Sequence, residues 1–117
     1  MSNNKSELDR DTGKTDSTDV QSRRAHLMTL AEDIFDVGFG AVIEIGAHEL
    51  EPFFIDGRGE KATVISDAPS ADCTWRGPEE TLVSVFQKNR ALQNAYLSGR
   101  LVIGGDMSVM ARLTLST

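Results

Sequence analysis

Four short runs of alternating apolar and polar residues follow residue 40, and turn-forming residues separate them. A two-residue period indicates a β-strand with one buried face. Because the connections are short, we expect three or four of these strands to pair in sequence as an antiparallel meander. The predicted strands cover residues 41–45, 53–55, 61–65 and 72–76, with a hairpin turn at residues 56–59.

A helical pattern precedes the strands. Its apolar residues recur at intervals of three and four, which places them on one face of a helix. They are Leu27, Leu30, Ala31, Ile34 and Phe35. We expect this helix to begin at residue 24 and to end at Gly38 or Gly40, since glycine commonly terminates helices.

The last third of the chain predicts two further helices, a fifth strand and a closing helix. Pro78 suits the first turn of a helix, and Asp106 is placed to cap the last one. Residues 101–103 are fully apolar, so we expect the fifth strand to be central or covered on both faces. We expect Leu82, Val85 and Phe86 to form the buried face of the first of these helices. The second carries Leu92, Ala95 and Tyr96 and ends at Gly99, and the closing helix places Met107, Met110 and Leu113 on one side.

Together these elements predict an α+β fold, a mostly antiparallel sheet of about five strands with helices packed on one face. Residues 1–23 are strongly polar and are predicted to be a disordered tail, with one folded domain at residues 24–117. Five basic and five acidic residues balance within residues 1–25, so the net charge of −6 belongs to the domain. That charge disfavours nucleic acid and anionic membranes as partners.

Composition also limits the class of protein. The single cysteine, Cys73, excludes an intrachain disulfide and a cysteine-based metal cluster. The first residues lack the apolar core of a secretory signal, and no run approaches the roughly 18 apolar residues of a membrane span. The chain ends in Leu-Ser-Thr, not in the peroxisomal Ser-Lys-Leu. We expect a soluble, cytoplasmic protein without cofactor, bound metal or stable membrane insertion.

Few residues could carry out chemistry. Cys73 lies in the middle of a predicted strand, where a buried and inert thiol is expected. His26 lies beside the apolar face of the first helix. His48 lies in a turn with Glu49 and Glu51, which together could form a general acid or a weak metal site. Tight metal sites need three or four convergent ligands, so we interpret this turn as a solvated loop.

Two other patterns have structural interpretations. Glu79 and Glu80 are adjacent on a helix, so their side chains diverge and complement the positive end of the helix dipole. Residues 99–106 are rich in glycine but match neither phosphate-binding pattern, so we interpret them as a bend between a strand and a helix. Arg100 and Arg112 remain candidate partners for an anionic ligand head.

Residues 71–74 read ADCT and residues 98–107 read SGRLVIGGDM. These stretches, with the helix that follows the first, resemble the sterol carrier protein type 2 family, whose members typically run Ala-Asp-Cys-Thr into a strand and Gly-x-Leu-x-Ile-x-Gly-Asp/Asn-Met into a terminal helix. The first half of the chain agrees in element order. The resemblance implies an apolar tunnel between sheet and helices that tolerates fatty acids, fatty acyl-CoA, sterols or phospholipids. Related domains also serve as dimerisation or accessory modules.

We therefore expect a non-catalytic carrier of apolar ligands. Methionine and aromatic side chains on short helices pack adaptably, as in promiscuous apolar sites, although the same side chains could simply form the core. The candidate ligand-binding residues are Leu30, Ile34, Trp75, Leu82, Phe86, Leu92, Tyr96, Leu101, Met107, Met110 and Leu113.

Two alternatives remain open at this point. The same apolar helix faces could contact a second copy of the chain or a partner enzyme, in a dimerisation or accessory module. Alternatively, an apolar pocket could hide a His or Asp base, as in a small cone-shaped isomerase or cyclase.

Overall fold

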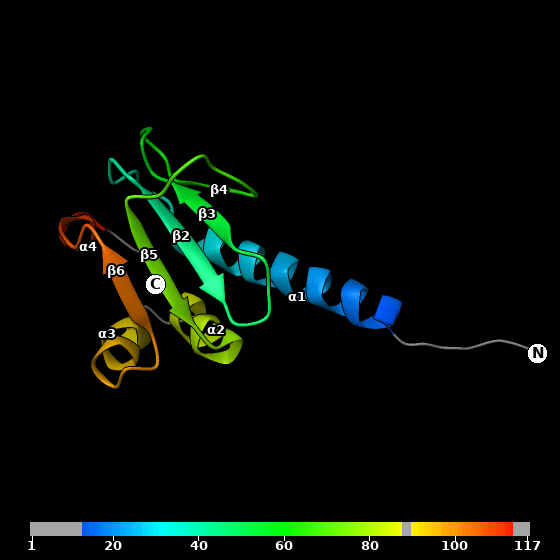
Figure 1. The fold of residues 1–117 in the computed structure, drawn as a ribbon. Coiled ribbons are helices and arrows are strands. Elements are labelled where there is room, and N and C mark those ends of the chain that lie inside the picture. Colours follow the sequence, from blue (N-terminus) through cyan, green and yellow to red (C-terminus); the bar gives the residue numbers. More distant parts are fainter. Residues whose placement is uncertain (1–12, 88–89, 114–117) are drawn as a thin grey trace, which may run out of the picture.

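The computed structural model describes residues 13–87 and 90–113 and has the expected α+β architecture. One five-stranded sheet has the order β4-β3-β2-β5-β6, and helices pack on one of its faces (Figure 1). In Figure 1, α3 and α4 lie at opposite ends of β6. The elements are α1 Gly13–Ile34, β2 Val42–Ala47, β3 Phe53–Asp56, β4 Thr63–Ile65, β5 Cys73–Gly77, α2 Glu79–Gln87, α3 Arg90–Leu97, β6 Val102–Gly105 and α4 Ser108–Arg112.

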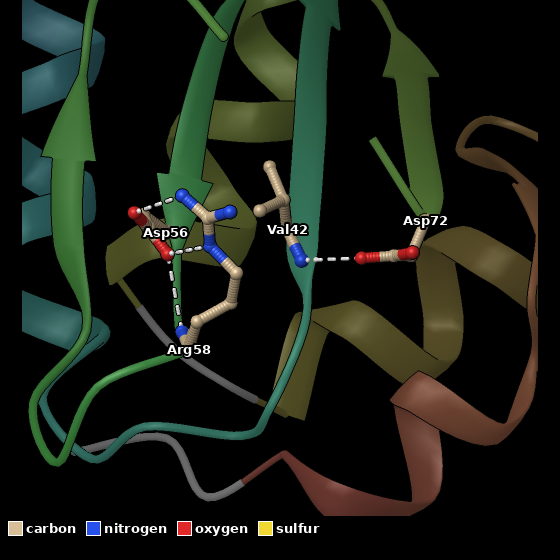
Figure 2. Close-up of polar contacts among 4 residues, drawn as sticks. All are labelled: Val42, Asp56, Arg58 and Asp72. Atoms are coloured by element: carbon tan, nitrogen blue, oxygen red, sulfur yellow. Dashed lines mark hydrogen bonds and ion pairs between the residues drawn. The ribbon is translucent and has the colours of Figure 1, made fainter. Parts of the chain in front are cut away.

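The first three strands form the predicted antiparallel meander, β2 with β3 and β3 with β4. The fourth does not continue it, because β5 crosses back and pairs in parallel with β2. Asp72 lies at this crossover: its N–H donates to the carbonyl of Val42 at 2.8 Å. Its carboxylate accepts the N–H of Val42 at 2.9 Å (Figure 2). The extension of the meander to four strands is therefore wrong, since local alternation does not specify which strands pair.

The turn between β3 and β4 confirms the predicted hairpin. The carboxylate of Asp56 accepts the backbone N–H of Arg58 at 3.1 Å and two guanidinium N–H groups, each at 2.9 Å (Figure 2). These bonds lower the pKa of Asp56 to about 2. Glycine is required at position 57, because a Cβ there would collide with the ring of Phe39.

β6 lies at the edge of the sheet, so the prediction of a central or doubly covered strand is wrong. Val102 is 62% exposed, whereas Leu101 is buried just before the strand and donates its N–H to the carbonyl of Ala95 at 3.0 Å. Ile103 pairs with Trp75 and shares its face of the sheet. Leu101 therefore packs in the core and Ile103 packs beside Trp75, while Val102 faces solvent, as expected for an edge strand.

α1 begins at Gly13 and ends at Ile34. Residues 13–23 are thus helical where the sequence predicts a disordered tail, and the helix ends before the predicted glycines; residues 1–12 lie outside the described residues. Val20 packs against the core, and polar contacts of Arg23 and Arg24 tie the helix to the rest of the domain. The Arg24 guanidinium donates to the carbonyls of Glu51, Pro52 and Ser66 at 2.7–2.9 Å, and Arg23 pairs with Glu79 at 2.7 Å. An apolar pattern could not reveal these contacts.

The core lies between the sheet and the helices. Trp75 and Phe53 are its largest fully buried side chains, and the predicted buried residues Leu82, Val85 and Phe86 of α2 pack there. Phe35 lies 5.6 Å from the Trp75 ring centroid and 6.1 Å from that of Phe86. Such aromatic pairs contribute about 0.5–1.5 kcal/mol each beyond their buried area.

Candidate ligand-binding site

An apolar groove of about 260 Å³ lies where α3, β6 and the start of the last helix meet. Its lining comes from three segments that are close in sequence. The lining residues are Leu92, Gln93 and Tyr96 of α3, Ile103 of β6, and Met107 and Met110 at α4.

Local sequence explains why these segments converge. Leu92 and Tyr96 are four residues apart, so α3 presents both on one side. Gly99 ends the helix at φ +80°, and Gly105 at φ +84° turns the chain from β6 toward α4. A Cβ on Gly105 would lie 2.5 Å from the carbonyl oxygen of Asp72, so only glycine fits this close approach.

The groove is open to solvent. Tyr96 is 45% exposed and Met107 is 43% exposed, whereas Leu92, Ile103 and Met110 are half-buried. Gln93 is the residue of the lining that carries an amide. Large apolar side chains gathered around a groove are typical of surfaces that bind an apolar partner, since leaving them in water is unfavourable.

The predicted ligand-binding residues separate into three groups in the structure. Leu92, Tyr96, Met107 and Met110 line the groove. Leu30 and Leu113 are half-buried against the core. The remaining five are fully packed in the core, namely Ile34, Trp75, Leu82, Phe86 and Leu101.

Two lining residues, Gln93 and Ile103, were not among the predicted ones. Ile103 lies in the apolar run 101–103, and alternation within that run would have placed it on the opposite face from Val102. Gln93 carries no such signal, because a polar residue on a short helix is ordinary.

Polar groups beside the groove are already paired. The carboxylate of Asp106 accepts the N–H of Ser108 at 2.9 Å and its hydroxyl at 2.6 Å, and these bonds hold the pKa of Asp106 below its usual range. The prediction that Asp106 caps the last helix is wrong, because the N-cap of α4 is Met107 and it makes no side-chain capping bond; Asp106 lies one residue earlier, and among the described residues its carboxylate bonds only to Ser108. Arg112 donates to the carbonyl of Phe39 at 2.9 Å, and Arg100 donates to the hydroxyl of Ser98 at 3.1 Å. Neither arginine lines the groove.

The reactive candidates do not converge on the groove. Cys73 is buried as predicted, and its burial raises the pKa of the thiol. His26 and His48 are exposed, and neither belongs to the lining. Within residues 13–87 and 90–113, no three His, Cys, Asp or Glu side chains gather as a metal site would require.

This combination of an α+β sheet, helices on one face and an apolar groove at the sheet edge defines a small domain with a fold suited to apolar ligands. The family model described as the SCP-2 sterol transfer family matches residues 21–114, and the chain belongs to that family. The resemblance noted at residues 71–74 and 98–107 is thereby confirmed.

Solved structures agree on the fold. The solution structure of the sterol carrier protein domain 2 of Helicoverpa armigera is similar with a TM-score of 0.55 and 15% identity, over 85% of this chain and 79% of that one. A structure titled UbiJ-SCP2 ubiquinone synthesis protein has a TM-score of 0.53 and 15% identity, over 84% and 91% of the two chains. No curated protein sequence matches this chain significantly. In the part of the chain that the structure describes, every helix is too short or too polar to cross a membrane.

Proposed function

We propose that this protein binds an apolar ligand in the groove between α3 and α4 and carries it without converting it. The ligand classes are those of its family: fatty acids, fatty acyl-CoA, sterols or phospholipids. The observation that carries the proposal is the lining itself, in which Leu92, Ile103 and Met110 lie half-buried beside the exposed Tyr96 and Met107. A ligand chain there would cover apolar surface that the free protein leaves in contact with water.

Burial of hydrocarbon supplies enough free energy for binding without a charged anchor. Each buried methylene contributes roughly 0.8 kcal/mol, so about six methylenes in the groove contribute about 5 kcal/mol before the cost of immobilising the ligand. Useful affinity needs more than this. We therefore propose that the ligand chain extends past the groove toward the core, where the predicted tunnel would lie.

The last helix is the element that would open. α4 spans only Ser108–Arg112, and its buried anchor is the side chain of Val109. Arg112 adds one hydrogen bond to the carbonyl of Phe39. A short terminal element with few buried contacts opens at a low free-energy cost, so it can admit a ligand between itself and β6.

We also propose that the protein leaves its bound ligand chemically unchanged. Among the residues that the structure describes, the lining includes no His, Asp or Glu that could act as a general base, which gives no support to the isomerase or cyclase alternative. Native mass spectrometry of the freshly purified protein, with solvent extraction of what co-purifies, tests the carrier function directly. A bound lipid released unchanged supports the proposal. A clean apo mass with no thermal shift on adding fatty acids, acyl-CoA or sterols contradicts it.

A second candidate is an accessory role beside an enzyme. It is supported by the likeness to a protein titled as a ubiquinone synthesis protein and by two exposed apolar side chains near the groove, Leu97 at 71% and Val102 at 62%. Analytical ultracentrifugation across a hundredfold range of concentration distinguishes the candidates. Self-association that disappears in Val102→Lys favours the interaction module. A monomer at all concentrations excludes a homodimer and leaves only a partner enzyme as the second chain.

A further inference from the structure

β6 forms an edge of the sheet that another strand could join. In the part of the chain that the structure describes, β5 pairs with one side of β6 and no strand pairs with the other. Residues 102–105 read VIGG and include neither a charged residue nor a proline, which commonly keep edge strands from pairing. In Figure 1, α3 and α4 lie at the two ends of this strand. An added strand would therefore meet the backbone of β6 between the two helices.

The register of β5 and β6 shows which backbone groups face the open edge. Gly105 is paired with Cys73, and one residue further on the N–H of Asp106 donates to the carbonyl of Asp72 at 2.8 Å. Hydrogen bonds alternate along an antiparallel strand. The N–H and C=O of Ile103 and the N–H of Gly105 therefore point away from β5.

We infer that two copies of this protein associate by pairing their β6 strands antiparallel, about a two-fold axis at Ile103. In this register the N–H of Ile103 donates to the carbonyl of the partner's Ile103, and the N–H of Gly105 donates to the carbonyl of the partner's Leu101. Because the contact is two-fold symmetric, association stops at the dimer. The inference is independent of the carrier function, and it specifies the contact that a homodimer would use.

Side chains on the outer face of the sheet complement their own copies in this register. Val102 lies opposite the partner's Gly104, which has no side chain to compete for the space. Val102 is 62% exposed in the single chain, so the contact removes apolar surface from water. Just beyond the strand, the exposed Arg100 lies opposite the partner's exposed Asp106, and the symmetry repeats this pair of opposite charges.

Arg100 and Asp106 retain atoms for this pairing. Among the bonds within the described residues, Arg100 uses Nε alone, which donates to the hydroxyl of Ser98 at 3.1 Å. Asp106 uses Oδ1 alone, which accepts the N–H and the hydroxyl of Ser108. The terminal nitrogens of the guanidinium and Oδ2 of the carboxylate can therefore form a charge-assisted hydrogen bond between the copies.

Apolar side chains flank β6 at both ends. Tyr96 and Leu97 at the end of α3 are 45% and 71% exposed, and Met107 before α4 is 43% exposed. Antiparallel pairing brings the end of α3 in each copy toward the start of the partner's α4. The contact therefore gathers the apolar side chains of both helices, in addition to the paired strands.

Other registers satisfy fewer of these groups. A shift in one direction places the carbonyl of Ile103 opposite the partner's Leu101, whose N–H already donates to the carbonyl of Ala95 at 3.0 Å. A shift in the other direction places Val102 opposite the partner's Asp106, an apolar side chain against a charge. The register centred on Ile103 avoids both faults.

Charge reversal tests this register. Arg100→Asp places like charges opposite one another across the contact, and so does Asp106→Arg. In analytical ultracentrifugation, each variant alone should associate roughly tenfold to hundredfold more weakly than the native chain. An equimolar mixture of the two variants restores both pairs of opposite charge, so we expect it to form a heterodimer about as stable as the native dimer. Lys61→Glu is the matched control, because it changes the net charge equally but lies beside β4 at the other edge of the sheet, and it should associate like the native chain.

A cross-link tests the same register without using charge. Ile103→Cys would face itself across the axis in a hydrogen-bonded pair, with Cα atoms about 5.5 Å apart, which is within the reach of a disulfide. Mild oxidation should therefore cross-link Ile103→Cys into a dimer. It should not cross-link Val102→Cys, which lies opposite Gly104. The native Cys73 is buried, so it does not compete.

The outcomes are separable from those of the ligand titrations. A native chain that stays monomeric at millimolar concentration overturns the inference, leaves a strand of another protein as the occupant of this edge, and does not affect the carrier function. A mixture of the charge variants that associates no better than either alone also overturns it, as does association that continues past the dimer. Circular dichroism shows whether each variant folds. If Asp106→Arg does not fold, the comparison of the two cysteine variants decides.

Discussion

A carboxylate placed in the groove should weaken ligand binding strongly while the domain stays folded. Met110 suits this substitution because it lines the groove on α4 and is only half-buried. In the free protein, an aspartate at this position can turn toward solvent. We therefore expect Met110→Asp to lower the free energy of unfolding by about 1 kcal/mol, mostly through lost packing.

The effect on binding is larger. Losing a half-buried methionine removes about 1 kcal/mol of apolar contact with the ligand. A carboxylate held against bound hydrocarbon adds a desolvation cost of about 1–3 kcal/mol. The two effects together give about 2–4 kcal/mol, which raises the Kd by roughly 30-fold to 1,000-fold.

Ala111→Asp is the matched control. Ala111 is the next residue of the same helix, is exposed and does not line the groove, so it receives the same charge near the same helix end. Both variants are titrated with a fluorescent fatty acid and with a neutral fluorescent sterol to obtain the Kd of each ligand. Circular dichroism confirms that the variants are folded. We expect the control to change the Kd less than threefold. A folded Met110→Asp protein with the Kd of the control would refute the location of the site.

Three further predictions concern the fold. Gly57→Ala should lower the free energy of unfolding by about 1–3 kcal/mol in urea titrations, because its Cβ collides with the ring of Phe39; an unchanged midpoint would contradict the close packing. In Arg58→Ala, NMR titration should show the pKa of Asp56 rising from about 2 toward its ordinary 3.8. Because the folded pKa is lowered, the stabilisation is present above pH 4 and is lost as pH falls toward 2, so the variant should lose less stability than the native chain over that range. Arg24→Ala removes three hydrogen bonds to carbonyls and should cost about 1–2 kcal/mol in the same urea titration; amide hydrogen exchange should rise mainly in the first half of α1, and uniform protection there would show that this arginine does not hold the helix.

Local patterns were sufficient to predict most elements of this fold. The spacing of Leu27, Ala31 and Ile34 predicts the first helix, and alternation predicts the strands, because each depends on the geometry of a few consecutive residues. The same patterns say nothing about partners distant in the sequence. Asp72 bonds to Val42 beside the parallel pairing of β5 with β2, and Arg24 ties α1 to the carbonyls of Glu51, Pro52 and Ser66, and no local pattern specifies either contact.

The same limit of local patterns applies to the candidate site. By itself the sequence determined which residues are apolar and which face of each element they share, and these properties placed Leu92, Tyr96, Met107 and Met110 in one candidate set with Trp75 and Leu82. Only the tertiary structure decided that the first four line an open groove and that the last two are buried. The physical reason is that hydrophobicity is a property of the side chain, whereas exposure depends on what packs against it. The position of β6 at the sheet edge leaves its neighbours uncovered, and that position depends on pairing between distant segments.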